Sequence, residues 1–572
     1  MAIERIRESD CISEQETPLF HTIINIFACF TLLLLSTGVL ISDEEGLTDW
    51  GLRLSSITIS AFAIMYFKRN ICFVANNKVV IAFALCFLMC IISDVFNHSL
   101  SFNVVAKLLS LCLMAILAFQ VKFYVWSKAL SLFSFFTSIV VLLNYLRITN
   151  IQLFDNPIGY ASTIALSIPF VIQFERSKLL CVICCVVYMA AIICIQSRCC
   201  ILALVVFFIY YYAPNLKCYI KAKRHKIAHI MCIIIVLILC ISGLYISKID
   251  SANGRLLIWQ TLVEMCTQST WWGWGSNAIL AHYMPNQANI LSSFNDEYQS
   301  WLADDVTHSF CEPLGIVVRY GFIGCASFLV FMYWSYRNTS TSNKKLFISV
   351  IIVWLVIALF SYPTYYATVS IIIVASCAIM QRTKSISLTR IQILLVHFMC
   401  IAFIALSAHR LYYEHRWLML YKTDIDDKGT IAAYTNLYPH LYHYPQFAYA
   451  YAVVCNLSGN TSKSDSLYIT LQHKINTYDT QLLHADNALT LHHYASAEDA
   501  FTKAHFMVPN RFMPLYGLMQ TYMQKGDTIQ ARNIAKQIVV KKIKVESNEV
   551  EMIKNEAQKL LAACKSNTIN YK

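Results

Sequence analysis

Long apolar runs recur through the first four hundred residues, and they restrict the fold more than any other feature of the sequence. We count about thirteen runs of roughly 16–22 residues between His21 and Leu406, each near the length at which a helix crosses a hydrocarbon core. Only 14% of the residues are charged and the mean hydropathy is +0.53, so too little polar surface exists to cover a soluble globule. The sequence therefore predicts an all-α polytopic membrane protein.

The predicted spans are best named by their central residues, because their ends are uncertain by several positions. The centres lie near Leu32, Ala61, Leu85, Leu111, Ser134, Leu166, Tyr188, Val205, Val236, Phe328, Val353, Ile372 and Phe403.

The distribution of Lys and Arg predicts the orientation of the chain, because basic residues resist translocation. With the N-terminus inside, about twenty basic residues fall on the inner face, and the short outer loops hold only Arg53, Arg147 and Arg198. This orientation places the segment 247–313 and everything after residue 410 outside the cytoplasm. The net charge of +12 is then mainly a topology signal, and membrane lipids, not nucleic acid, are the expected partners.

The composition changes after the last apolar run, which divides the chain into a membrane domain (1–410, with a large outer loop at 247–313) and a soluble helical domain (411–572). Turn signals at Pro509-Asn510 and at Gly526 separate three predicted helices, and Gly459 begins a similar turn about two 34-residue periods earlier. This tail resembles tetratricopeptide repeats, which bind protein partners; a generic helical bundle is the alternative.

Two outer arginines are candidates for binding an anion. Arg198 lies where one span ends outside and the next begins, and Arg255 begins a polar stretch with an amphipathic helical pattern. Arg198 is equally consistent with a loop arginine whose side chain reaches lipid headgroups. The apolar face of the predicted helix holds Leu256, Trp259, Leu262, Val263 and Cys266, and glycines are expected to end it at Gly273 and Gly275. Trp271, Trp272 and Trp274 suit an interfacial aromatic belt or, alternatively, stacking on sugar.

One histidine and several acids precede the tenth span, in "NDEYQSWLADDVTHSFCEPLGIVVRYGFIG". His308 is a candidate general base, because imidazole accepts a proton near neutral pH without prior tuning. A packing or surface histidine is the alternative. The acids could hold a divalent cation, although an acidic outer loop is usually only solvated, and no zinc-ligand spacing occurs. Cys266 and Cys311, both predicted to lie outside, could form a disulfide.

The order of several short segments resembles the O-antigen ligase superfamily, which includes O-antigen ligases, O-antigen polymerases and bacterial protein O-oligosaccharyltransferases. The segments are "FDNPIGYASTIALSIPF", "QSR", "GRLLIWQTLVEM", "WWGWG" and "HSFCEPLGIVVRYGFIG", and the resemblance covers about residues 20–385. It implies a helical glycosyltransferase of the bacterial inner membrane that moves a glycan from undecaprenyl diphosphate to a periplasmic acceptor. It also implies that Arg198 and Arg255 bind the diphosphate and that a loop histidine activates the acceptor hydroxyl.

The chain departs from the family pattern near the expected histidine. When Gly321 and Gly324 are aligned with the family's glycines, the usual histidine falls on Phe310, so His308 lies two residues earlier. Glu312 is therefore a second candidate base.

Four further residues are candidates for binding substrate. Asn156 alone is retained from an Asn-rich motif of the family, and we expect it to bind substrate together with the aromatic side chains of Trp259 and Trp274. Arg319 is either a third phosphate contact or a packing cation.

The leading hypothesis is transfer of an intact oligosaccharide to lipid A core or to a protein, without a cofactor or metal. A protein acceptor or partner would suit the repeat-like tail. A polymerase is one alternative, and a glycolipid transporter or a scaffold is another. Transporters usually carry internal symmetry or broken helices with polar residues in mid-membrane, and the sequence shows neither; Lys107 is the main charge within a span.

Overall fold

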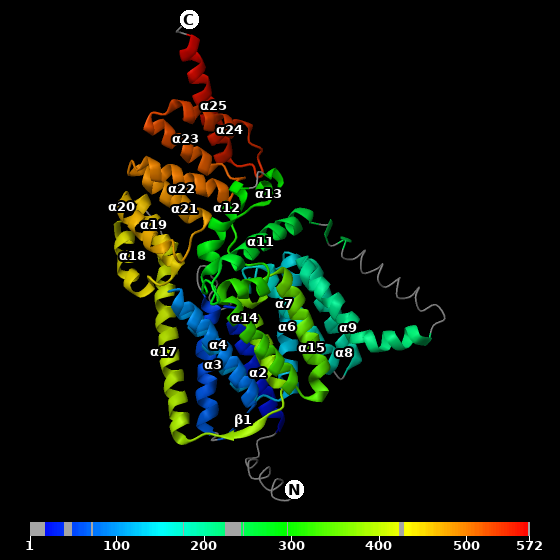
Figure 1. The fold of residues 1–572 in the computed structure, drawn as a ribbon. Helices are drawn as coiled ribbons and strands as arrows, with labels where there is room; N and C mark the ends of the chain where they lie inside the picture. Colours follow the sequence, from blue (N-terminus) through cyan, green and yellow to red (C-terminus); the bar gives the residue numbers. More distant parts are fainter. Residues whose placement is uncertain are drawn as a thin grey trace, which may run out of the picture.

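The computed structural model is almost entirely helical and confirms a multi-pass membrane protein (Figure 1). It describes residues 18–38, 49–69, 72–174, 177–222, 242–243, 245–246, 248–293, 296–422 and 428–569. Within these ranges seven helices are long and apolar enough to cross a membrane: α3 (Trp50–Arg69), α4 (Asn77–Phe96), α6 (Phe123–Tyr145), α8 (Lys178–Ile195), α14 (Glu312–Asn338), α15 (Lys344–Phe360) and α17 (Arg390–Tyr421).

Five shorter apolar helices accompany them: α2 (Pro18–Ser36), α5 (Phe102–Ala118), α7 (Pro157–Phe174), α9 (Arg198–Ala222) and α16 (Ala367–Ile379). Twelve of the predicted span centres lie in these twelve helices, one in each. The remaining centre, near Val236, falls outside the described residues.

The membrane domain is built around α7, which is buried on nearly every side from Ile158 to Val171. Helices α6, α8, α15, α9 and α16 pack around it. The outer helices instead expose large apolar side chains, as α8 does at Leu179, Val182 and Val186. Such surfaces suit a hydrocarbon solvent, because lipid does not penalise exposed apolar side chains as water does.

The segments assigned to the inner face lie together at one end of the molecule. Strand β1 (Cys72–Ala75) pairs antiparallel with β2 (Lys384–Ser387), and Thr339 bridges to Gln381 beside them. Figure 1 shows this ribbon at the opposite end from the loop helices and the tail. The orientation relative to a cell membrane stays a prediction.

Helix α14 is broken at Gly321, whose φ of 67° and ψ of −173° are not helical. The Trp271–Gly275 segment fills the break: Trp274 N donates to Val318 O at 2.9 Å, and Gly275 N donates to Arg319 O at 2.8 Å. A Cβ atom at Gly321 would collide with the carbonyl of Trp271, so glycine is required there. The sequence gives no sign of a broken helix, and the prediction that none is present was wrong, because the break depends on a partner segment distant in sequence.

The amphipathic helix of the loop is longer than predicted, and it buries a different face. Helix α11 (Ile249–Gln268) ends before Gly273 and Gly275, which lie in the following turn. Its buried residues include Leu257, Ile258, Leu262 and Met265, whereas Leu256 and Val263 of the predicted face are exposed. The buried face packs on α14 and on the other helices of the loop, which are partners that the local pattern does not reveal.

The tail is a stack of antiparallel helices: α18 (Lys428–Leu441), α19 (Pro445–Leu457), α20 (Thr461–Leu471), α21 (Tyr478–Thr490), α22 (Tyr494–Met507), α23 (Met513–Lys525), α24 (Thr528–Val540) and α25 (Asn548–Ile569). Gly459 and Gly526 have positive φ angles at the two predicted turns. The helix–turn–helix pattern is thus confirmed, while membership of the tetratricopeptide family stays a prediction, as does the domain boundary. Helix α17 continues through residue 410 as far as Tyr421.

The tail is joined to the outer loop by apolar contacts and hydrogen bonds. The loop contributes η1 (Ile279–Tyr283), α12 (Met284–Ser293) and α13 (Glu297–Leu302). Gln287 Nε2 donates to Met507 O at 2.7 Å, and Asn510 Nδ2 donates to Ala303 O at 2.6 Å. Met284 lies with Met507 in one buried cluster, so the loop has no separate core of its own on this side.

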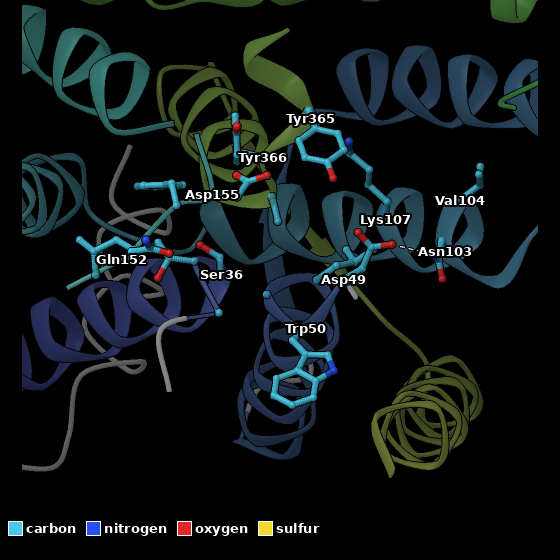
Figure 2. A pocket seen from close by; sticks show the side chains of 17 residues that line it. Ser36, Asp49, Trp50, Asn103, Val104, Lys107, Gln152, Asp155, Tyr365 and Tyr366 are labelled. Carbon is cyan, nitrogen blue, oxygen red and sulfur yellow. Dashed lines mark hydrogen bonds between the residues drawn. The ribbon is translucent and has the colours of Figure 1, made fainter. Parts of the chain in front are cut away.

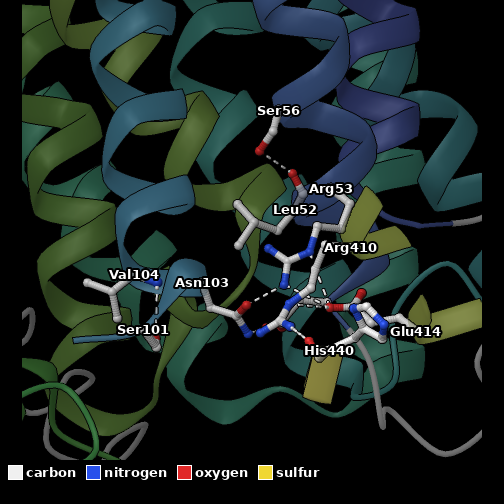
Figure 3. Close-up of polar contacts among 10 residues, drawn as sticks. Leu52, Arg53, Ser56, Ser101, Asn103, Val104, Arg410, Glu414 and His440 are labelled. Carbon is white, nitrogen blue, oxygen red and sulfur yellow. Dashed lines mark hydrogen bonds and ion pairs between the residues drawn. The ribbon is translucent and has the colours of Figure 1, made fainter. Parts of the chain in front are cut away.

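A buried ionic network joins α3, α5 and α17 at the tail end of the membrane helices (Figure 3). Arg53 and Glu414 are fully buried and 2.9 Å apart, and Arg53 Nη2 also donates to Asn103 Oδ1. Arg410 lies 3.8 Å from the same carboxylate and donates to the carbonyl of His440 on α18. The network therefore fixes the start of the tail relative to the membrane domain.

Candidate functional site

A polar cavity of about 350 Å³ opens where α5, α14 and the first tail helices meet. Three cations line it, Lys107, Arg319 and Arg410, together with the acids Asp49 and Glu312. The cavity thus holds nearly balanced charges within a largely apolar frame, where electrostatic interactions are stronger than in water.

A second cavity of about 290 Å³ adjoins the first (Figure 2). Asp49, Asn103, Lys107 and Tyr365 line both, and Asp155 lies at the other side of the second cavity. The Lys107 and Tyr365 side chains therefore stand between the two spaces.

The polypeptide between the two cavities is held by Glu312 and Lys107. Glu312 Oε1 accepts from Thr364 N at 2.7 Å and from the Thr364 hydroxyl, while Lys107 Nζ donates to Thr364 O at 2.7 Å. Glu312 Oε2 is buried and has no hydrogen-bond partner among the described residues. One carboxylate oxygen thus has a structural role and the other is left for a ligand or a proton.

His308 packs against the aromatic segment that carries Thr364. Its ring centroid lies 4.1 Å from that of Tyr362 and 4.6 Å from that of Tyr365. Phe310, at the position of the family's usual histidine, also contacts Tyr362, with centroids 5.0 Å apart. The two-residue displacement therefore leaves His308 beside the same tyrosine. Burial, aided by the charge of Arg319, lowers the pKa of His308 to about 4, so its imidazole is neutral at pH 7.

Arg198 and Arg255 come together although they belong to different helices. Arg198 donates to Lys248 O at 3.2 Å and to Ser251 Oγ at 3.0 Å, at the start of α11. Burial lowers the pKa of Arg255, and the neighbouring charge of Arg198 lowers it further. Tyr362 lies within electrostatic range of Arg255 and contacts the ring of His308.

Arg319 stands apart from that pair, at the polar cavity. Its Nε donates to Gly315 O at 3.0 Å, one turn earlier in α14, and the rest of the guanidinium faces the cavity. The charge of Arg319 is close enough to His308 to lower the pKa of the histidine.

The three residues expected to bind substrate make structural contacts. Asn156 Oδ1 accepts from Ile158 N at 3.0 Å at the start of α7. Trp259 Nε1 donates to Phe310 O at 3.5 Å, and Trp274 Nε1 donates to Met265 O at 3.2 Å. Their contact with substrate stays a prediction. Trp271 alone of the loop tryptophans is widely exposed, at 71%.

Sequence reasoning missed several residues of the site. Lys107 was noticed only as a charge within a span, and Asp49, Asp155 and the Tyr362–Tyr366 segment were not singled out. The available signal was the aromatic run "YPTYY" directly after a span. Within the described ranges no group of three His, Cys, Asp or Glu residues could hold a metal ion, and Cys266 and Cys311 are free thiols.

A comparison with protein-family models assigns the central part of the chain. Residues 161–329 match the family described as O-antigen ligase, and they include Arg198, Arg255, His308 and Arg319. No curated protein matches the chain. The family supports membrane glycosyl transfer of the ligase or polymerase type. The chain is therefore a multi-pass membrane protein whose residues 161–329 match the O-antigen ligase family.

Proposed function

We propose that the protein transfers an intact oligosaccharide from undecaprenyl diphosphate to a hydroxyl acceptor on the periplasmic side of a bacterial inner membrane. In this arrangement the N-terminus is cytoplasmic and the tail periplasmic. The acceptor is lipid A core or a protein, and the family makes a lipid-linked glycan the expected donor. Transfer by a polymerase, to another lipid-linked glycan, is the alternative reaction within the same family.

The adjacent Arg198 and Arg255 carry this proposal. Two like charges repel, and their proximity in a half-buried position costs free energy unless an anion lies between them. Arg255 forms no hydrogen bond or ion pair with another described residue, so its planar donors are available. Guanidinium groups bind phosphate oxygens in a bidentate manner. A diphosphate bound here gains negative charge as it leaves, and the pair would stabilise that charge.

The acceptor hydroxyl must lose its proton as its oxygen attacks the anomeric carbon and the bond from that carbon to the diphosphate breaks. We assign the proton to His308. In the free protein its pKa of about 4 makes it a weak base. A diphosphate on the nearby arginines would raise this pKa, because a negative neighbour favours the protonated imidazolium. The base would thus become effective only when the donor is bound.

Glu312 is the second candidate for the proton acceptor. Its Oε2 is buried without a partner among the described residues, beside the cavity that Lys107 and Arg319 line. In either case the step needs no metal or cofactor, because the arginines neutralise the leaving group and a side chain receives the proton.

Transfer in proteoliposomes tests the proposal. Labelled undecaprenyl-diphosphate oligosaccharide is supplied with lipid A core and with periplasmic protein, with and without a chelator. We expect transfer by the wild type and its loss in Arg255→Ala. Arg416→Ala is the matched control, since Arg416 is an exposed arginine on α17 outside the site. Undiminished transfer by Arg255→Ala would overturn the role of the arginine pair. An absence of transfer from any lipid-linked donor would favour a transporter or scaffold.

A further inference from the structure

A groove of about 780 Å³ lies between the outer loop and the tail, outside the cavities of the candidate site. Its walls come from α12 and α13 on one side, and from the end of α22 and the segment after α24 on the other. Figure 1 shows these elements grouped at the end of the molecule remote from the β-ribbon. We call it the Trp301 groove; its main lining residues are Tyr298, Trp301, His505, Phe506, Lys541 and Lys542.

The two walls of the groove are fixed to each other by polar contacts. Lys544 Nζ donates to Trp301 O at 2.8 Å, and Asn510 Nδ2 donates to the same carbonyl at 3.3 Å. Arg511 Nη2 lies 3.5 Å from Asp304 Oδ1 just beyond. The groove is therefore preformed, which lowers the entropic cost of binding a ligand.

The charge of the groove is positive. Lys541, Lys542 and Lys544 follow one another at its edge, and Glu297 is the acid among the lining residues. Burial lowers the pKa of Lys541 to about 8, so this amine is still largely protonated at pH 7. One of its protons is donated to Arg511 O at 2.7 Å, whereas Lys542 is exposed. These amines suit an anionic ligand.

Aromatic and neutral polar groups complete the groove. The Tyr298 side chain is 46% exposed, and its hydroxyl is held by Asp250 Oδ1 at 3.1 Å and by Asn253 Nδ2 at 2.9 Å. The tyrosine ring is thus oriented and still accessible. His505 Nδ1 is buried without a partner among the described residues, and burial lowers the pKa of His505 to about 4. A neutral imidazole can exchange one hydrogen bond with a hydroxyl group.

We propose that the Trp301 groove binds an acidic oligosaccharide, one whose sugars carry carboxylates. Sugar rings offer apolar C–H faces to aromatic rings, hydroxyls to the imidazole, and carboxylates to the lysines. The biological role rests on the proposed function. Transfer of an intact glycan joins its reducing end at the catalytic site, so the distal sugars must extend over the outer surface. Trp301 precedes His308 in the same loop.

Calorimetric titration of the full chain in detergent measures binding without any donor or acceptor. The probes are trigalacturonate and, as its neutral counterpart, maltotriose. We expect trigalacturonate to bind the wild type at least tenfold more tightly than maltotriose. Lys542→Glu should weaken trigalacturonate binding at least tenfold, and this exposed substitution leaves the packing unchanged. Lys536→Glu is the matched control, because Lys536 is an exposed lysine of α24 outside the groove and its reversal changes the net charge equally.

Three results would overturn the inference: no binding of trigalacturonate, equal binding of the neutral sugar, or equal losses in Lys542→Glu and Lys536→Glu. The proposed function fails separately. If trigalacturonate binds as expected but no lipid-linked donor supports transfer, the groove stands and the enzymatic role does not. If transfer occurs and the groove binds no acidic glycan, only this inference is lost.

Discussion

Two arginine sites in this protein differ in how their charge is neutralised. Arg53 is fully buried, but Glu414 lies 2.9 Å away and Asn103 accepts a further hydrogen bond. Arg198 and Arg255 are only half-buried, and the charge of Arg198 is close enough to Arg255 to lower its pKa. Arg53 finds its opposite charge within the fold. Arg255 instead forms no hydrogen bond or ion pair with another described residue, so its guanidinium is a candidate for binding an anionic ligand.

The largest effect is expected where a buried pair is broken. Glu414→Ala would leave Arg53 without its carboxylate in a dry environment and destabilise the protein by about 3–5 kcal/mol. Thermal unfolding of the purified chain in detergent measures this. The double variant Arg53→Met with Glu414→Leu should recover most of the loss, since it removes both charges. A loss below about 1 kcal/mol in Glu414→Ala would show that the pair is not structural.

Arg255→Ala should have the opposite effect: the rate of glycan transfer falls and the stability of the fold is kept. We expect a loss of about 100- to 1,000-fold in kcat, the usual consequence of removing one group that stabilises a developing anion. The unfolding temperature should stay the same or rise slightly, because repulsion from Arg198 is relieved. A fall in stability like that of Glu414→Ala would make the pair structural and remove the contrast between the two regions.

Arg255→Lys sharpens the comparison, because it keeps the charge and removes the planar donor fork. If a bidentate phosphate contact matters, transfer should fall about tenfold, less than in Arg255→Ala. Steady-state kinetics at several donor concentrations separates kcat from KM. Wild-type rates in Arg255→Lys would mean that transfer needs only a positive charge at this position and not the bidentate donors of arginine.

The pH dependence of the transfer rate tests the role of His308 as the base. His308 must be neutral to accept a proton, and burial lowers its pKa to about 4. In the free enzyme, kcat/KM should therefore fall only as the pH drops towards about 4, well below the range of an ordinary imidazole near about 6.5. With the donor bound, the fall in kcat at low pH should begin at a higher pH. His308→Gln should abolish this fall. If the fall persists in His308→Gln and disappears in Glu312→Gln, the base is Glu312.

A smaller effect is expected at Asp305, which lies between the loop and the tail and whose charge is only partly compensated. Burial raises its pKa to about 6, with a further contribution from Asp479. Because the folded pKa lies above the unfolded value, stability increases as the pH falls from about 6 to about 4 and is lost as it rises through that window. Asp305→Asn should remove this dependence and add about 1 kcal/mol at pH 7 in thermal unfolding. An unchanged pH dependence in Asp305→Asn would assign the titration to another group.

The membrane spans were predictable because each one depends only on its own apolar stretch of sequence. Each apolar run specifies its own helix whatever its neighbours are, and twelve predicted centres lie in helices. The turns at Gly459 and Gly526 were predictable for the same reason, since glycine adopts a positive φ at little cost.

The site was predicted as residue types more successfully than as an arrangement. Arg198, Arg255 and His308 were found because charged and titratable groups are rare near a membrane. The positions of Arg255 and His308 near Tyr362 were not predicted, since they depend on how α11 and the segment after α15 pack. Lys107 reaches Thr364 across a long sequence separation, and no periodicity in either segment indicates the contact. The face of α11 was misassigned because its packing against α14 and the other loop helices decides which side is covered.

The break in α14 restricts how substrates reach the site. The carbonyls of Val318 and Arg319 at the break receive their hydrogen bonds from Trp274 and Gly275 of the loop. If this part of the loop swung away as a lid, both carbonyls would lose their donors in a poorly hydrated region, at a cost of several kcal/mol. This part of the loop is therefore expected to stay in place, and the lipid-linked substrate proposed above would enter sideways between helices and not through a gate in the loop.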